Sequence, residues 1–237
     1  MASRNASFHE AGLGGAMLAP LKSVFVVVLV AALITLAAWV VDWIWVFKVW
    51  PDGVDRLRVI LAADLERASR LARWQELLPD AVAGTANLLY WAAFKLTGVH
   101  DMGLRFANGA PLSIPDTIVR NTYVANREAI EVAMIGTQLL GVRFAMILLI
   151  APTVLLLYVV AAADGLAQRA IRRAGGGRES ASIYHRGKHL QLALIVMTGG
   201  LCLLLPVSID PRLLWWPAGV MAALLARTQW AFYKKHL

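Results

Sequence analysis

The sequence contains a single cysteine, Cys202, and few charged residues. One cysteine can form no disulfide within the chain and no zinc site built from cysteines, so cysteine usage indicates no redox compartment. Charged residues make up 16% of the chain and hydrophobic residues 59%, whereas soluble domains average ~25% charged and ~45–50% apolar. Because the apolar excess is concentrated in long runs, we expect an all-α integral membrane protein.

The sequence also lacks the motifs of familiar active sites. The triplet Gly175–Gly177 is not followed by the Lys-Ser/Thr pair of a phosphate-binding loop and is better interpreted as a hinge between helices. His185 and His189 are four residues apart, but no third ligand is evident, and Arg186 and Lys188 would repel a cation. We therefore expect a protein that is not an enzyme, with no catalytic residue, no metal and no cofactor.

An uncharged run from Ser23 to Val41 is long enough to cross a bilayer. The alternative, a cleaved signal peptide, has a shorter apolar region and a small-residue cleavage site. Here the apolar run continues into a series of tryptophans that is typical of an interfacial belt on an uncleaved anchor: Trp39, Trp43, Trp45 and Trp50.

Between this run and the next one, the pattern predicts helices outside the bilayer. Apolar residues recur every three or four positions after Pro51, which predicts one amphipathic helix: Val54, Leu57, Leu61, Leu65, Ala68, Leu71, Trp74 and Leu78. A second helix is expected over 80–96 and a loop over 100–115. The sequence leaves open whether residues 80–98 enter the membrane.

Three further spans are expected, and a continuous helix from Thr117 leads into the first of them, in which Pro152 should produce a kink. The expected segments are an inner tail at 1–22, a span at 23–47, an extracytoplasmic helical region at 48–138, a span at 139–163, a basic inner loop at 164–189, spans at 190–208 and 212–233, and an inner tail at 234–237.

The distribution of charge predicts the orientation of these four transmembrane helices. The connector at 164–189 holds six Lys or Arg residues against two acids, and both tails are also basic. Placed on the cytoplasmic side, these segments together with Arg227 carry the whole net charge of +8, as the positive-inside rule requires. We therefore expect N-in/C-in topology in a bacterial inner membrane and no direct binding of nucleic acid.

Two charges fall at the outer ends of spans. Asp42 closes the first span and Arg143 opens the second, so both are expected at similar depth. An ion pair between them is one interpretation, because charges in membranes tend to find partners. The alternative is that each side chain reaches the interface alone.

Several short motifs resemble those of a family of integrating conjugative element membrane proteins. They are Asp164-Gly-Leu, Arg172-Arg173, Gly-Gly-Arg-Glu-Ser180, Tyr184-His-Arg-x-Lys188, Leu-Pro206-Val-Ser208 and Phe-Tyr-Lys-Lys235. That family is encoded among type IV secretion genes, often near the coupling ATPase. The resemblance implies a role in conjugative DNA transfer and supplies no catalytic residues.

We therefore expect a subunit of the conjugation apparatus that binds the coupling ATPase or another membrane subunit, with association of identical chains left open. The expected contact residues lie in the basic connector: Arg172, Arg173, Arg178, Glu179, Tyr184, His185, Arg186 and Lys188. The alternative for these residues is that they only set topology and bind anionic lipid. Alternatives for the whole protein are an exclusion or regulatory protein of the mobile element and, less favoured, a small membrane transporter or enzyme.

Overall fold

A computed structural model describes residues 7–73, 81–107, 114–176 and 181–233, and it contains no strand in these ranges. The all-helical prediction is confirmed for this part of the chain. The elements are α1 (Ser7–Ile44), the π-helical turn η1 (Trp45–Val49), α2 (Val54–Arg73), α3 (Ala81–Tyr90), the π-helical turn η2 (Trp91–Lys95), α4 (Val99–Ala107), α5 (Ile114–Ala125), α6 (Arg127–Ala174), α7 (Ala181–Leu204) and α8 (Pro211–Ala231).

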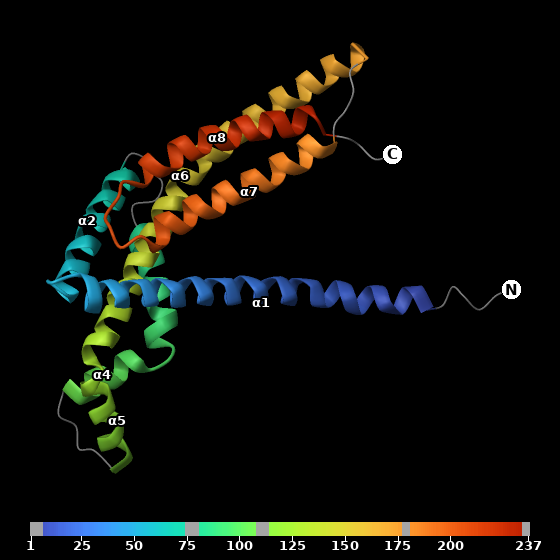
Figure 1. The fold of residues 1–237 in the computed structure, drawn as a ribbon. Helices are drawn as coiled ribbons and strands as arrows, with labels where there is room; N and C mark the ends of the chain where they lie inside the picture. The colour runs from blue at the N-terminus through green and yellow to red at the C-terminus, as the bar shows by residue number, and fades with distance from the viewer. Residues whose placement is uncertain (1–6, 74–80, 108–113, 177–180, 234–237) are drawn as a thin grey trace.

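Helix α6 is the element on which the others assemble. Its 48 residues give a length of roughly 70 Å, more than twice the ~30 Å hydrocarbon core of a bilayer. Helices α1, α2 and α3 pack against its first half and α8 lies along its second half (Figure 1). Helix α6 therefore forms one wall of the helical core in its first half and a candidate span in its second.

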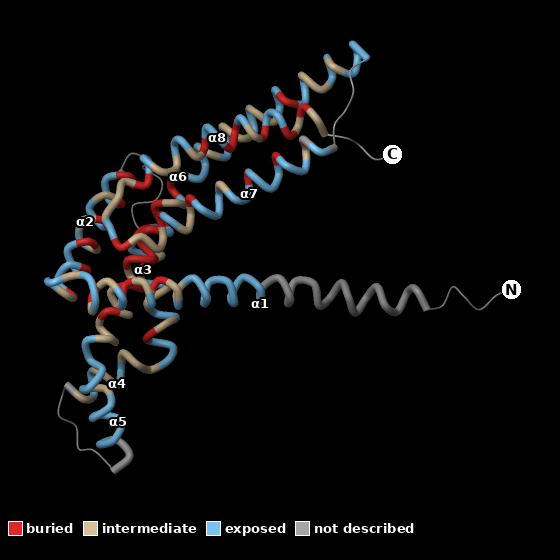
Figure 2. Tube along the Cα trace, viewed as in Figure 1, coloured by how far each residue is buried: buried red, intermediate tan, exposed pale blue. Residues whose placement is uncertain are grey.

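The burial of α6 changes accordingly along its length (Figure 2). From Val132 to Ile150 its apolar side chains are mostly buried in protein. Beyond this segment large apolar residues such as Leu155, Leu156 and Val160 are exposed. Exposed aliphatic residues at this density suit contact with lipid rather than water.

The core consists of two apolar clusters along α6. One joins α2, α3 and α6 through residues that include Leu71, Val82 and Met146. The other joins η1, α2 and α6 through residues that include Leu57 and Leu139. These clusters hold η1, α2 and α3 on α6, because burying an aliphatic side chain contributes about 1.5–3 kcal/mol each.

Two glycines let neighbouring helices approach α6 closely. A Cβ at Gly141 would lie 2.6 Å from Cα of Ala86, so α3 meets α6 backbone to backbone. A Cβ at Gly165 would collide with the carbonyl oxygen of Arg227, so α8 does the same at the other end. Small residues at such crossings are typical of helix packing in membranes.

Three helices in the described ranges are long and apolar enough to cross a membrane: Phe25–Val49, Arg127–Ala174 and Tyr184–Leu204. Helix α8 occupies the place of the fourth expected span but is not among the three. The beginning of α1, the end of α6, the beginning of α7 and the end of α8 lie on one side of the molecule (Figure 1). Helices α2, α4 and α5 lie toward the opposite side.

The structure corrects several expected boundaries. Residues 100–115 were expected as a loop, but α4 covers Val99–Ala107. The glycine in it, Gly103, lies against the Tyr123 ring, where a Cβ would be 2.5 Å from the hydroxyl, so it serves packing rather than a turn. The expected continuous helix from Thr117 is interrupted at Asn126. The inner tail at 1–22 is helical from Ser7 onward.

One position in the buried stripe of α2 differs from the expected one. Leu65 is 40% exposed, whereas Asp64 is 1% exposed. Positions 57, 61, 64, 68 and 71 follow the three-four spacing that faces the core, so an acidic residue stands in the middle of the buried face. The expected stripe members Trp74 and Leu78 lie outside the described residues.

Candidate functional site

A buried ion pair joins α2 to α6 and, through Arg143, to the end of α7 and the loop that follows it. Arg143 of α6 donates from Nε to Oδ2 of Asp64 in α2 at 2.9 Å, and both side chains are buried. Its other two nitrogens donate to three backbone carbonyls at the end of α7 and in the following loop: Leu203 at 3.3 Å, Leu205 at 2.5 Å and Val207 at 3.0 Å. The guanidinium therefore satisfies three carbonyls that the end of a helix leaves without partners.

Asp64 is held by more than Arg143. The hydroxyl of Ser208 donates to Oδ1 of Asp64, and Arg67 lies 3.4 Å from the same oxygen and also donates to Ser208. We call Asp64, Arg67, Arg143 and Ser208 the polar node. It fixes α2, α6 and the α7–α8 loop together, and its two buried charges, Asp64 and Arg143, are paired, as burial requires.

The ion pair between Asp42 and Arg143 was one of two interpretations of the sequence, and in the structure the hydrogen-bonded partner of Arg143 is Asp64. Asp42 is buried between α1 and α6, and its carboxyl group lies against Gly136, where a Cβ would collide with it. Asp42 is close enough to Arg143 for electrostatic attraction. The sequence analysis did not single out Asp64; its place three residues after Leu61 and four before Ala68, on helical spacing, is the signal that could have identified it.

At the other end of the molecule, part of the basic connector is used for packing. Arg172 donates from Nη1 to the carbonyl of Ala231 at 3.1 Å, and its guanidinium lies 3.8 Å from the centre of the Phe232 ring. The Tyr184 ring packs against Tyr233, with centroids 5.4 Å apart. These contacts fasten α6 and α7 to the end of α8, so Arg172 and Tyr184 have structural partners.

Two further residues that the sequence did not single out contribute to the same end. Arg169 lies over the Tyr233 ring at 5.2 Å, and Arg227 pairs with Asp164 at 2.5 Å. The first interaction is a cation–π contact, which is worth about 0.5–1 kcal/mol at an exposed site. The second is half-exposed on both sides and adds little stability.

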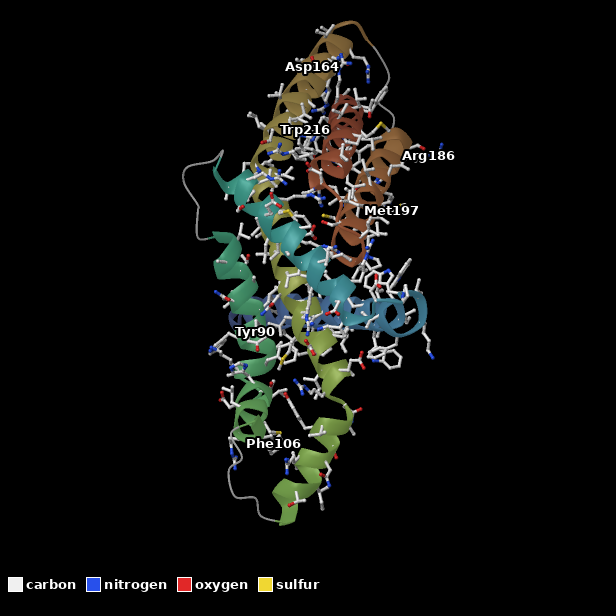
Figure 3. The ribbon with its side chains drawn as sticks, turned by 90° about the vertical axis from the view of Figure 1, so that its left-hand side faces the viewer. Tyr90, Phe106, Asp164, Arg186, Met197 and Trp216 are labelled. Carbon is white, nitrogen blue, oxygen red and sulfur yellow. The ribbon has the colours of Figure 1, made fainter. Side chains whose placement is uncertain are left out.

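The remaining expected contact residues present their side chains to the surroundings. We call Arg173, His185, Arg186 and Lys188 the inner basic end, and all four are exposed. Figure 3 shows Arg186 and Asp164 near one end of the molecule, far from Tyr90 and Phe106. Arg178 and Glu179 lie outside the described residues. Such a surface attracts anions, which include the acidic face of a protein and lipid phosphates.

Within the described ranges, no three His, Cys, Asp or Glu side chains gather where they could hold a metal ion. The chemistry of both sites is therefore described by ion pairing, hydrogen bonding and aromatic contact.

The fold and these sites define a helical protein with membrane-spanning candidates, a buried polar node and an exposed basic end. Residues 49–234 match the DtrJ-like family, described as IncC plasmid conjugative DNA transfer protein DtrJ-like, and the chain belongs to this family. No curated protein and no solved structure matches the chain. The family supports a role in conjugative DNA transfer, which confirms the part of the resemblance that concerns conjugation. The match includes both sites and leaves out α1.

Proposed function

We propose that the protein is a non-enzymatic inner-membrane subunit of the type IV secretion apparatus that carries out conjugative DNA transfer. It crosses the membrane four times, with both termini in the cytoplasm. The family match supports the process, and the three apolar helices support the location.

The packing of α8 supports its assignment as the fourth span. It lies between α6 and α7 and contacts both over most of its length (Figure 1). Its buried face is made of small residues: Gly219, Ala222, Ala223 and Ala226. Its large apolar residues, among them Leu213, Val220 and Leu224, are exposed. Small residues inside and aliphatic residues outside are what helices in lipid require.

The inner basic end is the proposed docking surface for the coupling ATPase or its membrane anchor. The observation that carries this proposal is that the cations of the connector differ in their contacts. Arg172 is held by Ala231 and Phe232, whereas Arg186 and Lys188 project outward on α7. A complementary acidic surface on the partner would steer the encounter and fix its orientation.

The test is charge reversal at Arg186 and Lys188 to Glu, followed by purification from gently solubilised membranes. The coupling ATPase should co-purify with the wild-type protein and be lost with the double variant. Arg56→Glu, an exposed cation of α2 in the extracytoplasmic region, is the matched control and should retain the ATPase. Retention of the ATPase and of DNA transfer by the double variant would refute the docking surface.

Deletion in donor and recipient cells separates transfer machinery from an exclusion protein. A defect when the donor lacks the gene supports the proposed subunit. An increase in transfer into recipients that lack the gene would instead assign the protein to exclusion. If the double variant loses only its affinity for vesicles that contain phosphatidylglycerol, the inner basic end binds lipid and the docking proposal fails.

A further inference from the structure

A large cavity among the described residues lies away from the polar node and the inner basic end. It has a volume of about 700 Å³, which falls within the ~300–1,000 Å³ of small-molecule sites. It is lined by η2, α4, α5, the beginning of α6 and the turn between η2 and α4, and Trp39 of α1 contributes to its wall. We call this cavity the arm groove.

The lining of the arm groove is apolar. It includes Phe94, Met102, Val119, Ile130 and Ala133. Four polar side chains of the lining donate hydrogen bonds to nearby acceptors: Thr97 to Ala93 at 2.7 Å, Thr122 to Ile118 at 3.0 Å, Asn126 to Thr122 at 2.8 Å and Trp39 to Thr137 at 2.9 Å. These four donors are already used, so the groove suits an apolar occupant better than a polar metabolite.

The position of Trp39 gives the depth of the groove. It lies ten residues before Val49, where the first candidate span ends, which corresponds to about 15 Å along a helix. A span of 25 residues exceeds the hydrocarbon core only slightly, so Trp39 is roughly 10 Å below the outer boundary of that core. The arm groove therefore lies at the depth of the outer leaflet.

The direction of the surrounding helices agrees with this depth. In Figures 1 and 3 the arm formed by α4, α5 and the beginning of α6 runs across the direction of α1. Transmembrane helices tilt on average only ~20° from the bilayer normal, so an arm that crosses α1 lies along the membrane plane. Its exposed apolar residues would then meet lipid: Leu96, Leu104, Ile118, Val119 and Val124.

We propose that the arm lies in the outer leaflet and that the arm groove binds one acyl chain of a phospholipid. The groove continues from the surface of the first span through Trp39, so a chain can enter it from the bilayer. The inference requires α1 to cross the membrane, but it does not depend on the inner basic end or on its partner.

The test uses the full-length protein in vesicles of phosphatidylethanolamine and phosphatidylglycerol, with a trace phospholipid that carries a diazirine near the end of one acyl chain. After irradiation, labelled peptides are mapped by mass spectrometry. Labelling should concentrate on the groove-lining residues between Ile118 and Ala133. Ala133→Phe, which fills the groove, should lower that labelling by about tenfold, equivalent to ~1.4 kcal/mol of binding. Val124→Phe, at an exposed position outside the lining, should leave it unchanged.

Labelling at Leu155 to Val160 of α6 reports separately on membrane insertion, because this segment is exposed and apolar whatever the groove holds. Labelling of this α6 segment without labelling of the groove-lining residues would overturn the inference and leave the proposed function intact. Equal labelling of wild type and Ala133→Phe would also overturn it. A photoreactive benzoylphenylalanine at Ile118 that cross-links to protein instead of lipid would assign the groove to another polypeptide and overturn it likewise.

A second measurement applies if Ala133→Phe does not fold. In a Cys202→Ser background, a spin label at Ile118→Cys should collide more with oxygen than with a water-soluble nickel chelate. The same label at Asp55→Cys, on an exposed side chain of α2, should show the reverse. A label at Ile118 that behaves like the one at Asp55 would place the arm in water and refute the proposal.

Discussion

Removing one partner of the buried pair Asp64–Arg143 should destabilise the protein more than any exposed charge does. Asp64→Leu leaves Arg143 with its three carbonyl acceptors but without a counter-ion in a buried site. Breaking a buried pair in this way costs about 3–5 kcal/mol. For a chain of this size, each kcal/mol lowers the Tm by ~2–4 °C, so the expected fall is roughly 6–20 °C.

The assay is thermal unfolding of the purified protein in detergent, followed by circular dichroism. The double variant Asp64→Leu, Arg143→Met should lose less than the sum of the two single variants, because it buries no unpaired charge. The same cycle with Asp42→Asn should give a smaller interaction energy, since no hydrogen bond joins Asp42 to Arg143. Asp55→Asn, on a side chain that is 76% exposed, serves as the control and should cost under ~1 kcal/mol.

The reasoning would be refuted by a fall in Tm for Asp64→Leu no larger than that for Asp55→Asn. A larger interaction energy for Asp42 than for Asp64 would show that the sequence-based pairing was right and the structural one wrong. Either result would remove the polar node as the link between α2 and the α7–α8 loop.

Three further predictions concern packing and topology. Gly165→Val should force α8 away from α6 and lower the Tm by several degrees. Gly200→Ala is the control: a Cβ at Gly200 has nothing within 4 Å, so the substitution should change stability by no more than ~0.5 kcal/mol. Equal effects of the two variants would contradict the close α6–α8 crossing. Leu57→Ala should cost about 2–5 kcal/mol because the side chain is fully buried, and Val59→Ala, on a side chain that is 62% exposed, should cost far less; the reverse order would contradict the core. A reporter active only in the periplasm should give signal when inserted at Gly53 and none at Gly176, both of which are glycines with positive φ in open space; the opposite pattern would overturn the proposed topology.

The sequence by itself determined the helical class, the apolar runs and the association with conjugation. Run length and helical periodicity are local properties of the sequence, so they can be recognised without knowledge of the tertiary contacts. Helices α7 and α8 cover most of the two apolar runs found in the C-terminal part of the sequence for this reason. The family-specific motifs from Asp164 onward likewise depend on residue order alone, and the family match supports conjugative DNA transfer.

Only the tertiary structure decided which charges pair and which glycines are packing residues. Asp42 and Arg143 have similar predicted depth, but the acid that completes Arg143 comes from α2, seventy-nine residues away in the chain. Gly103 resembles a loop residue until the Tyr123 ring is seen against it. Arg172 and Arg186 are equally basic in sequence, yet Phe232 covers one and leaves the other exposed. Partner choice and burial depend on segments that are distant in sequence, and only the folded chain brings these together.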